Sequence, residues 1–391
     1  MNILFANKYS VKTGGVEYYI NALAVRLQDE GHKIGIVHWD EVREGARAGF
    51  SEHYRITALW NNELIMTGKT RDRLNAVLRE FSPDIAYLHN VENAKVIDYF
   101  ATQVPTVRYI HGYKTVDPDG KMLLCNPVEA NSYPLSPACF VRAYTRGVMP
   151  RNPVKGIKAY LRAKSVLEAT KRLEKIIVAT GHMKETLINN GIEPGRISVL
   201  PYFVDYRQQQ AGETPDRRRI LFTGRIAEGK GLVLLFDVLK LVEKDYILDV
   251  VGTGPMEKIS WEKAKSLGIA GQVRFHGWVG HEHLPEYYRR ASFLVVPSVW
   301  PEPFGICGIE AAFFGRSAVA FNVGGISDWL IDGETGFLIE PYNKEKMADR
   351  IDCFLGDPEK AIEFGRKARK LAEKKYAPDL HIEKLLKIFG K

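Results

Sequence analysis

The sequence has little cysteine and lacks long apolar runs. Four cysteines in 391 residues are too few for a scaffold held by disulfides. Its apolar stretches are all shorter than the roughly 20 residues that a transmembrane helix needs. The start, MNILFANKYS, lacks the basic region and apolar core of a signal peptide. These absences predict a cytoplasmic protein, long enough to bury its own core without metal or disulfides.

Two common nucleotide-binding motifs are also missing. The sequence has no G-x-x-x-x-G-K-[ST] segment, which excludes a P-loop NTPase. The segment Gly252-Thr253-Gly254 follows a predicted strand, but Glu257 stands where a dinucleotide fingerprint has its third glycine. An NAD-dependent enzyme is therefore disfavoured.

Strand-like apolar runs alternate with helical patterns through two similar halves of the chain. Such runs include NILFAN, KIGIVHW, DIAYLH, VPTVRYIH and EKIIVAT, and then RRILFTG, YILDVVG, SFLVVPS and SAVAFNV. Alternation of this kind predicts parallel sheets covered by helices on both faces. The polar, unperiodic segment 203–217 is typical of a linker, and a cleft between two such halves is where a ligand is expected.

Residues 112–153 interrupt this alternation with several prolines and no clear period. Irregular segments of this length in compact domains are usually functional. Asp117 and Asp119 resemble a two-carboxylate metal site, but Asp-Pro-Asp-Gly is also a common turn sequence, and we predict the turn. Cys125 and Cys139 are two ligands short of a zinc site. Unpaired thiols are favoured, and the sequence leaves open whether they pair or bind metal.

Glycines and cations after predicted strands indicate a phosphate ligand. Gly14 and Gly15 join the first strand to the first helix, where backbone amides and the helix dipole attract anions. A tight strand–helix turn is the alternative. Arg225 and Lys230, beside Gly224, follow another strand and could clamp a diphosphate, the arginine by its fork and the lysine as a point charge.

Two glutamates separated by seven residues stand out in PEPFGICGIE. Glu302 lies in a proline-flanked loop, and Glu310 lies in the helix that follows. Because Glu310 is surrounded by apolar neighbours, an unpartnered carboxylate there would be costly. A carboxylate that binds a ribose diol accepts two hydroxyl hydrogen bonds at once, which is a suitable role for a buried glutamate. The backbone amides of Phe304, Gly305 and Ile306 would point toward a ligand from the helix start.

Basic residues are concentrated in residues 140–175. This stretch holds ten Lys and Arg against two Glu, a surplus equal to the net charge of +8 of the whole chain. A solvated helix face is the ordinary explanation. Interleaved Phe140, Tyr144 and Tyr160 favour instead a surface for anionic lipid or a phosphate-bearing acceptor.

Together these segments resemble the family-4 retaining glycosyltransferases of the GT-B fold. The matching pieces, in family order, are TGGVE, His111 in RYIHGY, FTGRIAEGKG, VVGTGP, FHGW, PEPFGICGIE and FNVGGISDWLIDGETGFLIEP. They spread over residues 1–341, and the second half is the more specific part.

The resemblance implies a role for each matching residue. Arg225 and Lys230 would neutralise the donor diphosphate, Glu302 would face the transferred sugar, and Glu310 would hold the ribose hydroxyls. Gly15 would let its loop close over the diphosphate, and His111 would lie beside the sugar near the reacting carbon. The resemblance places the catalytic groups at His111, Glu302, Arg225 and Lys230, and the donor site at Gly14, Gly15, Gly224, Arg225, Lys230, Thr253, Gly277, Trp278, Val279, Phe304, Gly305, Ile306 and Glu310.

The expected architecture is α/β: two Rossmann-like doubly wound domains that face each other across a cleft. An acceptor-side domain would span 1–203 with a returning helix at 373–391, and a nucleotide-sugar-binding domain would span 204–372. The expected reaction moves a hexosyl unit, with retention, from a UDP-sugar, or alternatively a GDP-sugar, to an acceptor hydroxyl without a metal or other cofactor.

The expected acceptor is a saccharide, lipid-linked or a polysaccharide precursor, in envelope glycan synthesis. The enzyme would then lie peripherally on the inner face of the membrane, with no nucleic acid as partner. Two alternatives remain: a nucleotide-sugar epimerase on the same fold, which would form product from donor alone, and a basic binding module for anionic polymer. Base, sugar, linkage and oligomeric state are not fixed by the sequence.

Overall fold

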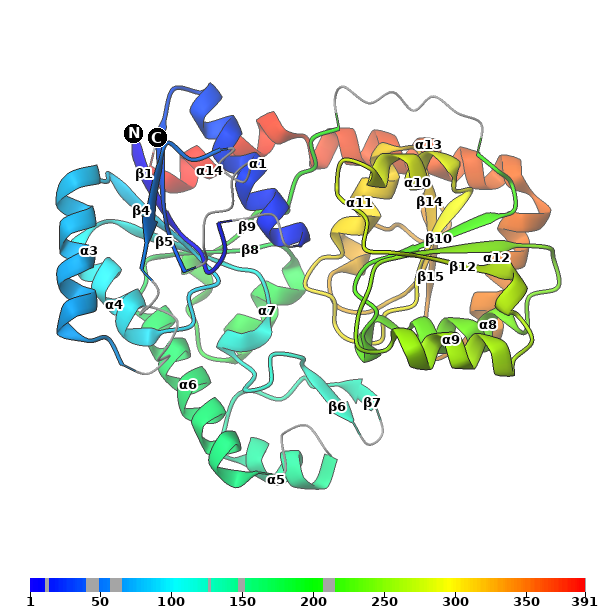
Figure 1. The fold of residues 1–391 in the computed structure, drawn as a ribbon, viewed down its shortest axis with the longest axis horizontal. Coiled ribbons are helices and arrows are strands. Elements are labelled where there is room, and N and C mark those ends of the chain that lie inside the picture. Colours follow the sequence, from blue (N-terminus) through cyan, green and yellow to red (C-terminus); the bar gives the residue numbers. More distant parts are fainter. Residues whose placement is uncertain are drawn as a thin grey trace. The chain divides into compact units, whose positions relative to one another are not determined.

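The computed structural model describes residues 1–10, 14–39, 49–56, 65–125, 128–146, 152–206 and 215–390 (Figure 1). The chain divides into two compact units. Unit 1 comprises Met1–Phe203 and Pro378–Lys391, and unit 2 comprises Val204–Ala377. The segment that returns to unit 1 starts at Pro378 and not at residue 373, because helix α13 (Pro358–Lys375) continues within unit 2.

Unit 1 contains a seven-stranded sheet in which every neighbouring pair of strands is parallel. In sheet order the strands are β3 (Glu52–Arg55), β2 (Lys33–His38), β1 (Asn2–Ala6), β4 (Ile85–His89), β5 (Thr106–Ile110), β8 (Lys175–Val178) and β9 (Ile197–Val199). The chain runs outward from β1 to β3 and then returns to the other side of β1 at β4. The order of the strands therefore reverses between β1 and β4, although these two strands are parallel. Ligands bind at such a point of reversal in open α/β sheets.

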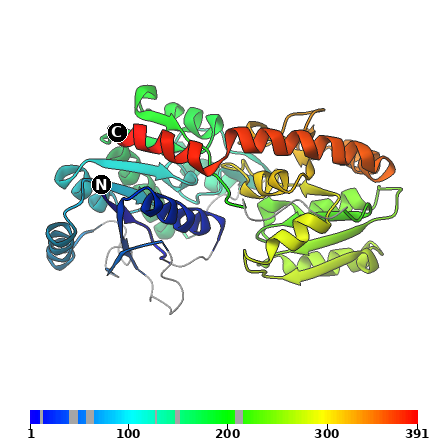
Figure 2. The ribbon, with the colours of Figure 1, turned by 90° about the horizontal axis from the view of Figure 1, so that it is seen from above.

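The longer helices of unit 1 follow its strands, except for the last one, α14, to which the chain returns after unit 2. They are α1 (Gly15–Asp29), α3 (Gly68–Phe81), α4 (Ala94–Gln103), α6 (Pro153–Lys171), α7 (Gly181–Asn189) and α14 (Pro378–Phe389). Helices α1 and α14 both lie in front of the sheet in Figure 2. The Tyr19 hydroxyl of α1 lies 2.8 Å from His381 Nε2 of α14, and His381 Nδ1 donates to the carbonyl of Pro201 at 2.8 Å. One imidazole thus joins the last helix to the first helix and to residue 201.

The irregular segment after β5 contains short elements that the sequence did not predict. They are the 3-10 turn η1 (Tyr113–Thr115), the hairpin β6 (Leu123–Cys125)–β7 (Val128–Ala130) and helix α5 (Ala138–Arg146). The hairpin and α5 project away from the sheet of unit 1 (Figure 1). The predicted turn at Asp117 is confirmed: Gly120 has φ +72°, and the Asp117 carboxylate accepts from the amides of Lys121 and Met122 at 2.9 and 3.1 Å.

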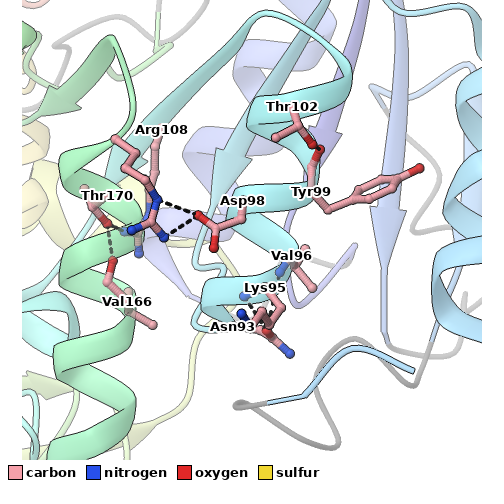
Figure 3. Close-up of polar contacts among 10 residues, drawn as sticks. Asn93, Lys95, Val96, Asp98, Tyr99, Thr102, Arg108, Val166 and Thr170 are labelled. Carbon is pink, nitrogen blue, oxygen red and sulfur yellow. Dashed lines mark hydrogen bonds and ion pairs between the residues drawn. The ribbon is translucent and has the colours of Figure 1, made fainter. Parts of the chain in front are cut away.

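Polar contacts hold helices α4 and α6 at one side of β5 (Figure 3). Asn93 caps α4 by accepting from the amides of Lys95 and Val96. Arg108 of β5 is buried, and it donates to the Thr170 hydroxyl of α6 and to the carbonyl of Val91. The guanidinium therefore places a buried positive charge near the end of β5.

Unit 2 contains a six-stranded parallel sheet. In sheet order the strands are β12 (Val273–Gly277), β11 (Ile247–Val251), β10 (Arg219–Thr223), β13 (Phe293–Val296), β14 (Ser317–Phe321) and β15 (Gly336–Ile339). The helices are α8 (Leu232–Leu239), α9 (Glu257–Ser266), α10 (Leu284–Arg290), α11 (Ile306–Phe313), α12 (Lys344–Gly356) and α13. Helices α8 and α9 lie on one side of the sheet and α10, α11 and α13 on the other (Figure 1).

The strand order of unit 2 also reverses next to its first strand. The chain runs from β10 outward to β12 and returns on the other side of β10 at β13. The loops that leave the carboxyl ends of β10 and β13 are therefore neighbours. Helix α8 ends at Leu239. Among the described residues, no helix is both long and apolar enough to cross a membrane.

Candidate active site

Lys230 and Glu302 are in contact at the point where the strand order of the unit 2 sheet reverses. Lys230 follows β10 and Glu302 follows β13, so the strand order brings the two loops together. Lys230 Nζ lies 2.7 Å from Glu302 Oε1, and the Ser298 hydroxyl donates to the same oxygen at 2.6 Å. The glutamate side chain is 4% exposed and the lysine side chain 29%. The lysine thus compensates a buried carboxylate while part of its surface stays open to solvent.

Backbone contacts fix these two loops against each other. The Val299 amide donates to the Gly229 carbonyl at 2.9 Å. Gly231 has φ +72°, and a Cβ at this position would lie 1.9 Å from the Pro297 carbonyl oxygen. Only glycine fits here, because any side chain would push the two loops apart.

Arg225 lies on the same loop after β10 and is exposed. In the part of the chain that the structure describes, its guanidinium makes no hydrogen bond or ion pair. The neighbouring carbonyl of Gly224 is covered by Gly252 of the loop after β11, where a Cβ would lie only 1.9 Å from it. Gly252 is therefore explained by the packing of the two loops, and the exposed Thr253 follows it.

The other predicted donor residues of unit 2 lie at the same edge of the sheet. Gly277 ends β12 with φ +69°, and its carbonyl accepts from the Gly252 amide at 2.8 Å. Trp278, the next residue, is 68% exposed, which is unusual for so large a side chain, and Val279 is half-buried. The carboxyl ends of β10, β11, β12 and β13 thus carry all of the sites predicted for unit 2 except Glu310.

Helix α11 starts at this edge without a side-chain cap. Gly305, its N-cap, has φ +87°, and Ile306 is its first residue. The Phe304 side chain is buried, while its carbonyl accepts from the indole of Trp329 at 2.7 Å. The start of α11 thus carries the partial positive charge of a helix N-terminus beside Glu302.

Glu310 lies inside unit 2 on helix α11, with its side chain 7% exposed. Tyr288 donates to Oε2 at 2.7 Å, and His281 Nε2 lies 2.8 Å from Oε1. The Tyr206 hydroxyl is farther from Oε1, at 3.4 Å. Burial together with the carboxylate of Glu310 raises the pKa of the Tyr288 phenol, so this phenol stays protonated and remains a donor.

In unit 1, His111 follows β5 and is mostly buried. Its Nε2 lies 2.8 Å from His89 Nδ1, and its Nδ1 lies 2.7 Å from the Tyr202 hydroxyl. Burial, with the charge of Arg108 as a second cause, lowers the pKa of His111 to about 3. The imidazole is therefore neutral near pH 7, and both of its nitrogens have partners within unit 1.

Gly14 and Gly15 start helix α1 as predicted. Gly14 is the N-cap, in extended conformation at φ −164°, and no side chain caps the helix. Both glycines are exposed, and the preceding Thr13 lies outside the described residues. This helix start therefore offers backbone amides, and the Glu17 carboxylate of the first turn lies close to Gly14.

Sequence reasoning missed several partners of the predicted residues. They are Ser298, His281, Tyr288, Tyr206, His89 and Tyr202. Ser298 lies four residues before Glu302, but a serine at that distance is no signal by itself. The others come from distant parts of the chain and become neighbours only through the strand order.

The structure also bears on the metal sites considered from the sequence at Asp117 and Asp119 and at Cys125 and Cys139. No group of three or more His, Cys, Asp or Glu is placed to hold an ion there. Cys139, Cys307 and Cys353 are free thiols, and the side chain of Cys125 lies outside what the structure describes.

Two family models match the chain. The model described as "Glycosyltransferase Family 4" matches residues 13–208, and the model described as "Glycosyl transferases group 1" matches residues 205–371. The chain belongs to glycosyltransferase family 4. The resemblance that the motifs indicated is thereby confirmed.

Several curated relatives match part of this chain in sequence. A D-inositol 3-phosphate glycosyltransferase of Streptomyces avermitilis is 35% identical over 224 residues, which is 51% of this chain and 48% of that protein. A lipopolysaccharide 1,2-N-acetylglucosaminetransferase of Salmonella typhimurium is 30% identical over 185 residues, 44% of this chain and 48% of that protein. In these matches the chain spans about half the length of the curated relatives.

Solved structures show the fold of this family-4 glycosyltransferase over its whole length. HepE of Anabaena, solved in complex with UDP and glucose, superposes with a TM-score of 0.75 at 16% identity and covers 99% of both chains. With its two parallel Rossmann-like sheets, the chain has the GT-B fold that we predicted.

The basic stretch forms parts of α5 and α6. Val154, Ile157 and Leu161 are spaced so that they share one face of α6, and all three are exposed, at 59%, 49% and 46%. Lys158 and Lys164 are exposed on the same face. The opposite face of α6 packs into unit 1 through Tyr160, Ala163, Val166, Leu167 and Thr170. The outer face of α6 therefore combines apolar side chains with positive charge.

Proposed function

We propose that this chain is a retaining glycosyltransferase that moves a hexosyl unit from a nucleotide diphosphate sugar to an acceptor hydroxyl. The observation that carries the proposal is the convergence of Lys230, Glu302 and the uncapped start of α11 at the point where the strand order of the unit 2 sheet reverses. The exposed Arg225 lies on the same loop as Lys230. Cleavage of a sugar–phosphate bond develops negative charge on the leaving diphosphate. Fixed cations and amides stabilise that charge without reorganising.

The donor we propose is a UDP-sugar, and the reaction requires no metal ion. The structures of HepE with UDP-containing ligands support uridine, and a GDP-sugar is the second choice. Arg225 and Lys230 would supply the positive charge that a metal ion supplies elsewhere. The uridine would lie beside Gly277, Trp278, Val279 and Thr253, with its ribose on Glu310.

Glu302 and His111 are the proposed groups nearest the transferred sugar. Glu302 Oε1 is occupied by Lys230 and Ser298, whereas Oε2 takes no hydrogen bond from the residues that the structure describes. This oxygen would accept from a sugar hydroxyl. His111 would contribute as a neutral group, because its pKa lies far below 7. Gly14 and Gly15 would bind the diphosphate through the amides at the start of α1.

The acceptor we propose is a saccharide of envelope glycan synthesis, carried on a lipid or a polysaccharide precursor. The lipopolysaccharide-modifying relative supports this class. The outer face of α6 would then bind the anionic surface of the membrane: Val154, Ile157 and Leu161 would enter the headgroup region, and Lys158 and Lys164 would meet lipid phosphates. Peripheral binding of this kind would place the active site near a lipid-linked acceptor.

Calorimetric titration with UDP and GDP, with EDTA present, tests the donor assignment. We expect one base to bind, EDTA to leave the affinity unchanged, and Lys230→Ala to weaken it. Incubation with UDP-sugar alone distinguishes the epimerase, which would form a new sugar nucleotide without acceptor. Absence of binding to every nucleotide, together with affinity for anionic polymer that falls steeply with salt, would favour the binding module.

A further inference from the structure

Glu310 is buried without a lysine or arginine partner among the ion pairs of the described residues. Its side chain is 7% exposed, and His281 is the ion-pairing group that contacts it. A buried carboxylate is tolerated only when hydrogen bonds replace its water. Those bonds come from His281 on Oε1 and Tyr288 on Oε2. These two residues therefore determine where the carboxylate points.

The carboxylate also determines the state of His281. An ionised carboxylate only accepts hydrogen bonds, so the Nε2 of His281 must carry a hydrogen. The ring of Tyr206 stacks on this imidazole, with centroids 5.5 Å apart and planes 6° from parallel. Stacking and hydrogen bond together hold His281 in one orientation.

The two short hydrogen bonds leave room for a ligand. Each carboxylate oxygen has two acceptor positions, and the bonds of 2.7 and 2.8 Å take one position on each oxygen. Among the described residues, only the long Tyr206 contact of 3.4 Å competes for a remaining position. Among the described residues, Oε2 therefore keeps one acceptor position, and Oε1 could accept a second hydroxyl in place of the Tyr206 contact, as binding of a vicinal diol requires.

His281 and Tyr288 differ in their access to such a ligand. Tyr288 is fully buried on α10. His281 has a side chain that is 15% exposed, and it follows Trp278 in the loop after β12. Of the two donors, His281 is the one on a loop that carries predicted nucleotide-binding residues.

We propose that His281 is a positioning residue for ribose recognition. Its Nε2–H holds the Glu310 carboxylate so that the remaining acceptor position on each oxygen faces the 2′- and 3′-hydroxyls of the donor. The inference rests on the proposed function, in which Glu310 binds the ribose. It adds that ribose recognition depends on a residue outside the two-glutamate motif.

Calorimetric titrations with UDP and 2′,3′-dideoxy-UDP, which lacks both hydroxyls, test this role. The wild type is expected to bind UDP at least about tenfold more tightly than 2′,3′-dideoxy-UDP, because hydrogen bonds to a charged carboxylate are stronger than those between neutral groups. In His281→Ala this preference should fall below about threefold through weaker UDP binding, while the affinity for 2′,3′-dideoxy-UDP stays within about twofold of wild type. His281→Gln, whose amide can also donate, should restore part of the preference.

His283→Ala is the matched control, since His283 lies two residues farther along and its side chain is 66% exposed. It should behave as wild type. Retention of the full preference in His281→Ala would overturn the inference, and so would equal weakening of both nucleotides, which indicates a general loss of loop structure. If the wild type binds UDP and 2′,3′-dideoxy-UDP equally, ribose recognition by Glu310 itself is wrong. If it binds neither, nor the corresponding guanosine pair, the proposed function fails first.

Discussion

Lys230 and Glu302 form an ion pair across 72 positions of the chain, with Nζ 2.7 Å from Oε1. The pair joins the loop after β10, the first strand of unit 2, to the loop after β13, the strand at which the strand order reverses. A donor diphosphate at this edge would share the lysine with the glutamate. The two roles of Lys230, compensating a buried charge and binding an anion, can be separated by mutation.

Lys230→Ala should lower kcat/KM about 10²–10³-fold through the lost stabilisation of the leaving diphosphate. It should also lower the free energy of unfolding by about 1–3 kcal/mol, because the buried Glu302 carboxylate loses its cationic hydrogen-bond partner. The double variant Lys230→Ala/Glu302→Ala should be more stable than the single variant but equally inactive. Urea unfolding and steady-state kinetics measure the two effects. A double variant that is less stable than Lys230→Ala would contradict this explanation.

Arg225→Ala should weaken donor binding without changing stability. Its guanidinium is exposed and unpaired in the described part of the chain, so its removal breaks no hydrogen bond or ion pair there. Isothermal titration with UDP should show about tenfold weaker binding, and the melting temperature should stay the same. Arg218→Ala, at the amino end of the same strand, is the control and should change neither quantity.

The buried histidines of unit 1 should make the protein less stable in mild acid. Burial lowers the pKa of His111 and of His381 to about 3, against about 6.5 in the unfolded chain. Between these values the unfolded state binds more protons, so stability should fall as the pH drops from about 6.5 toward about 3. Unfolding free energies at pH 7.5 and pH 5 should differ less in His381→Asn than in the wild type.

The same low pKa predicts a catalytic pH profile without a His111 step between pH 5 and 8. The imidazole signals of His111 should also stay in their neutral position throughout this range when they are followed by NMR. A His111 resonance that titrates near pH 6 would show that the side chain is more accessible than its burial indicates.

Gly231→Ala should lower the free energy of unfolding far more than the same replacement at a glycine that has open space around it. A Cβ there would lie 1.9 Å from the Pro297 carbonyl oxygen. Gly268 has a similar φ of +74°, but a Cβ at this position would have open space around it, with no described residue beyond its chain neighbours within 4 Å. Gly268→Ala should cost only the strain of positive φ, about 1–2 kcal/mol. Urea unfolding should show a clearly larger loss for Gly231→Ala, and equal losses would mean that the two loops separate easily.

The outer face of α6 should bind vesicles that contain anionic lipid. Co-sedimentation with phosphatidylcholine vesicles should require phosphatidylglycerol, and it should be lost in Ile157→Ser/Leu161→Ser and in Lys158→Glu/Lys164→Glu. Lys69→Glu/Lys95→Glu makes the same charge change at two exposed lysines elsewhere on unit 1 and should bind as wild type. Equal binding of all variants would assign membrane affinity to another surface.

The sequence predicted those elements in which local pattern and tertiary packing agree. Runs such as IAYLH and SAVAF are apolar because both faces of their strands are covered, so the pattern alone identifies them. Strand β3, with the sequence EHYR, lies at the sheet edge, is only half covered and has no apolar run. Helix α5 and the β6–β7 hairpin are too short to show a period.

The candidate site was predictable to the same extent. The spacing of Glu302 and Glu310 and the cations after β10 are local features, and the structure places all four residues in unit 2. His281, Tyr288 and Tyr206 could not be predicted as partners of Glu310, because nothing near them in the sequence refers to residue 310. Their convergence is a consequence of the strand order.

The hydrogen bonds of His381 have a consequence for how the chain is made. Unit 2 is one continuous segment, but unit 1 is complete only when Pro378–Phe389 packs beside α1 through Tyr19 and His381. During synthesis, a nascent chain that has emerged as far as Ala377 holds every residue of unit 2 but lacks the last helix of unit 1. The domain that is translated first is therefore the one that finishes folding last.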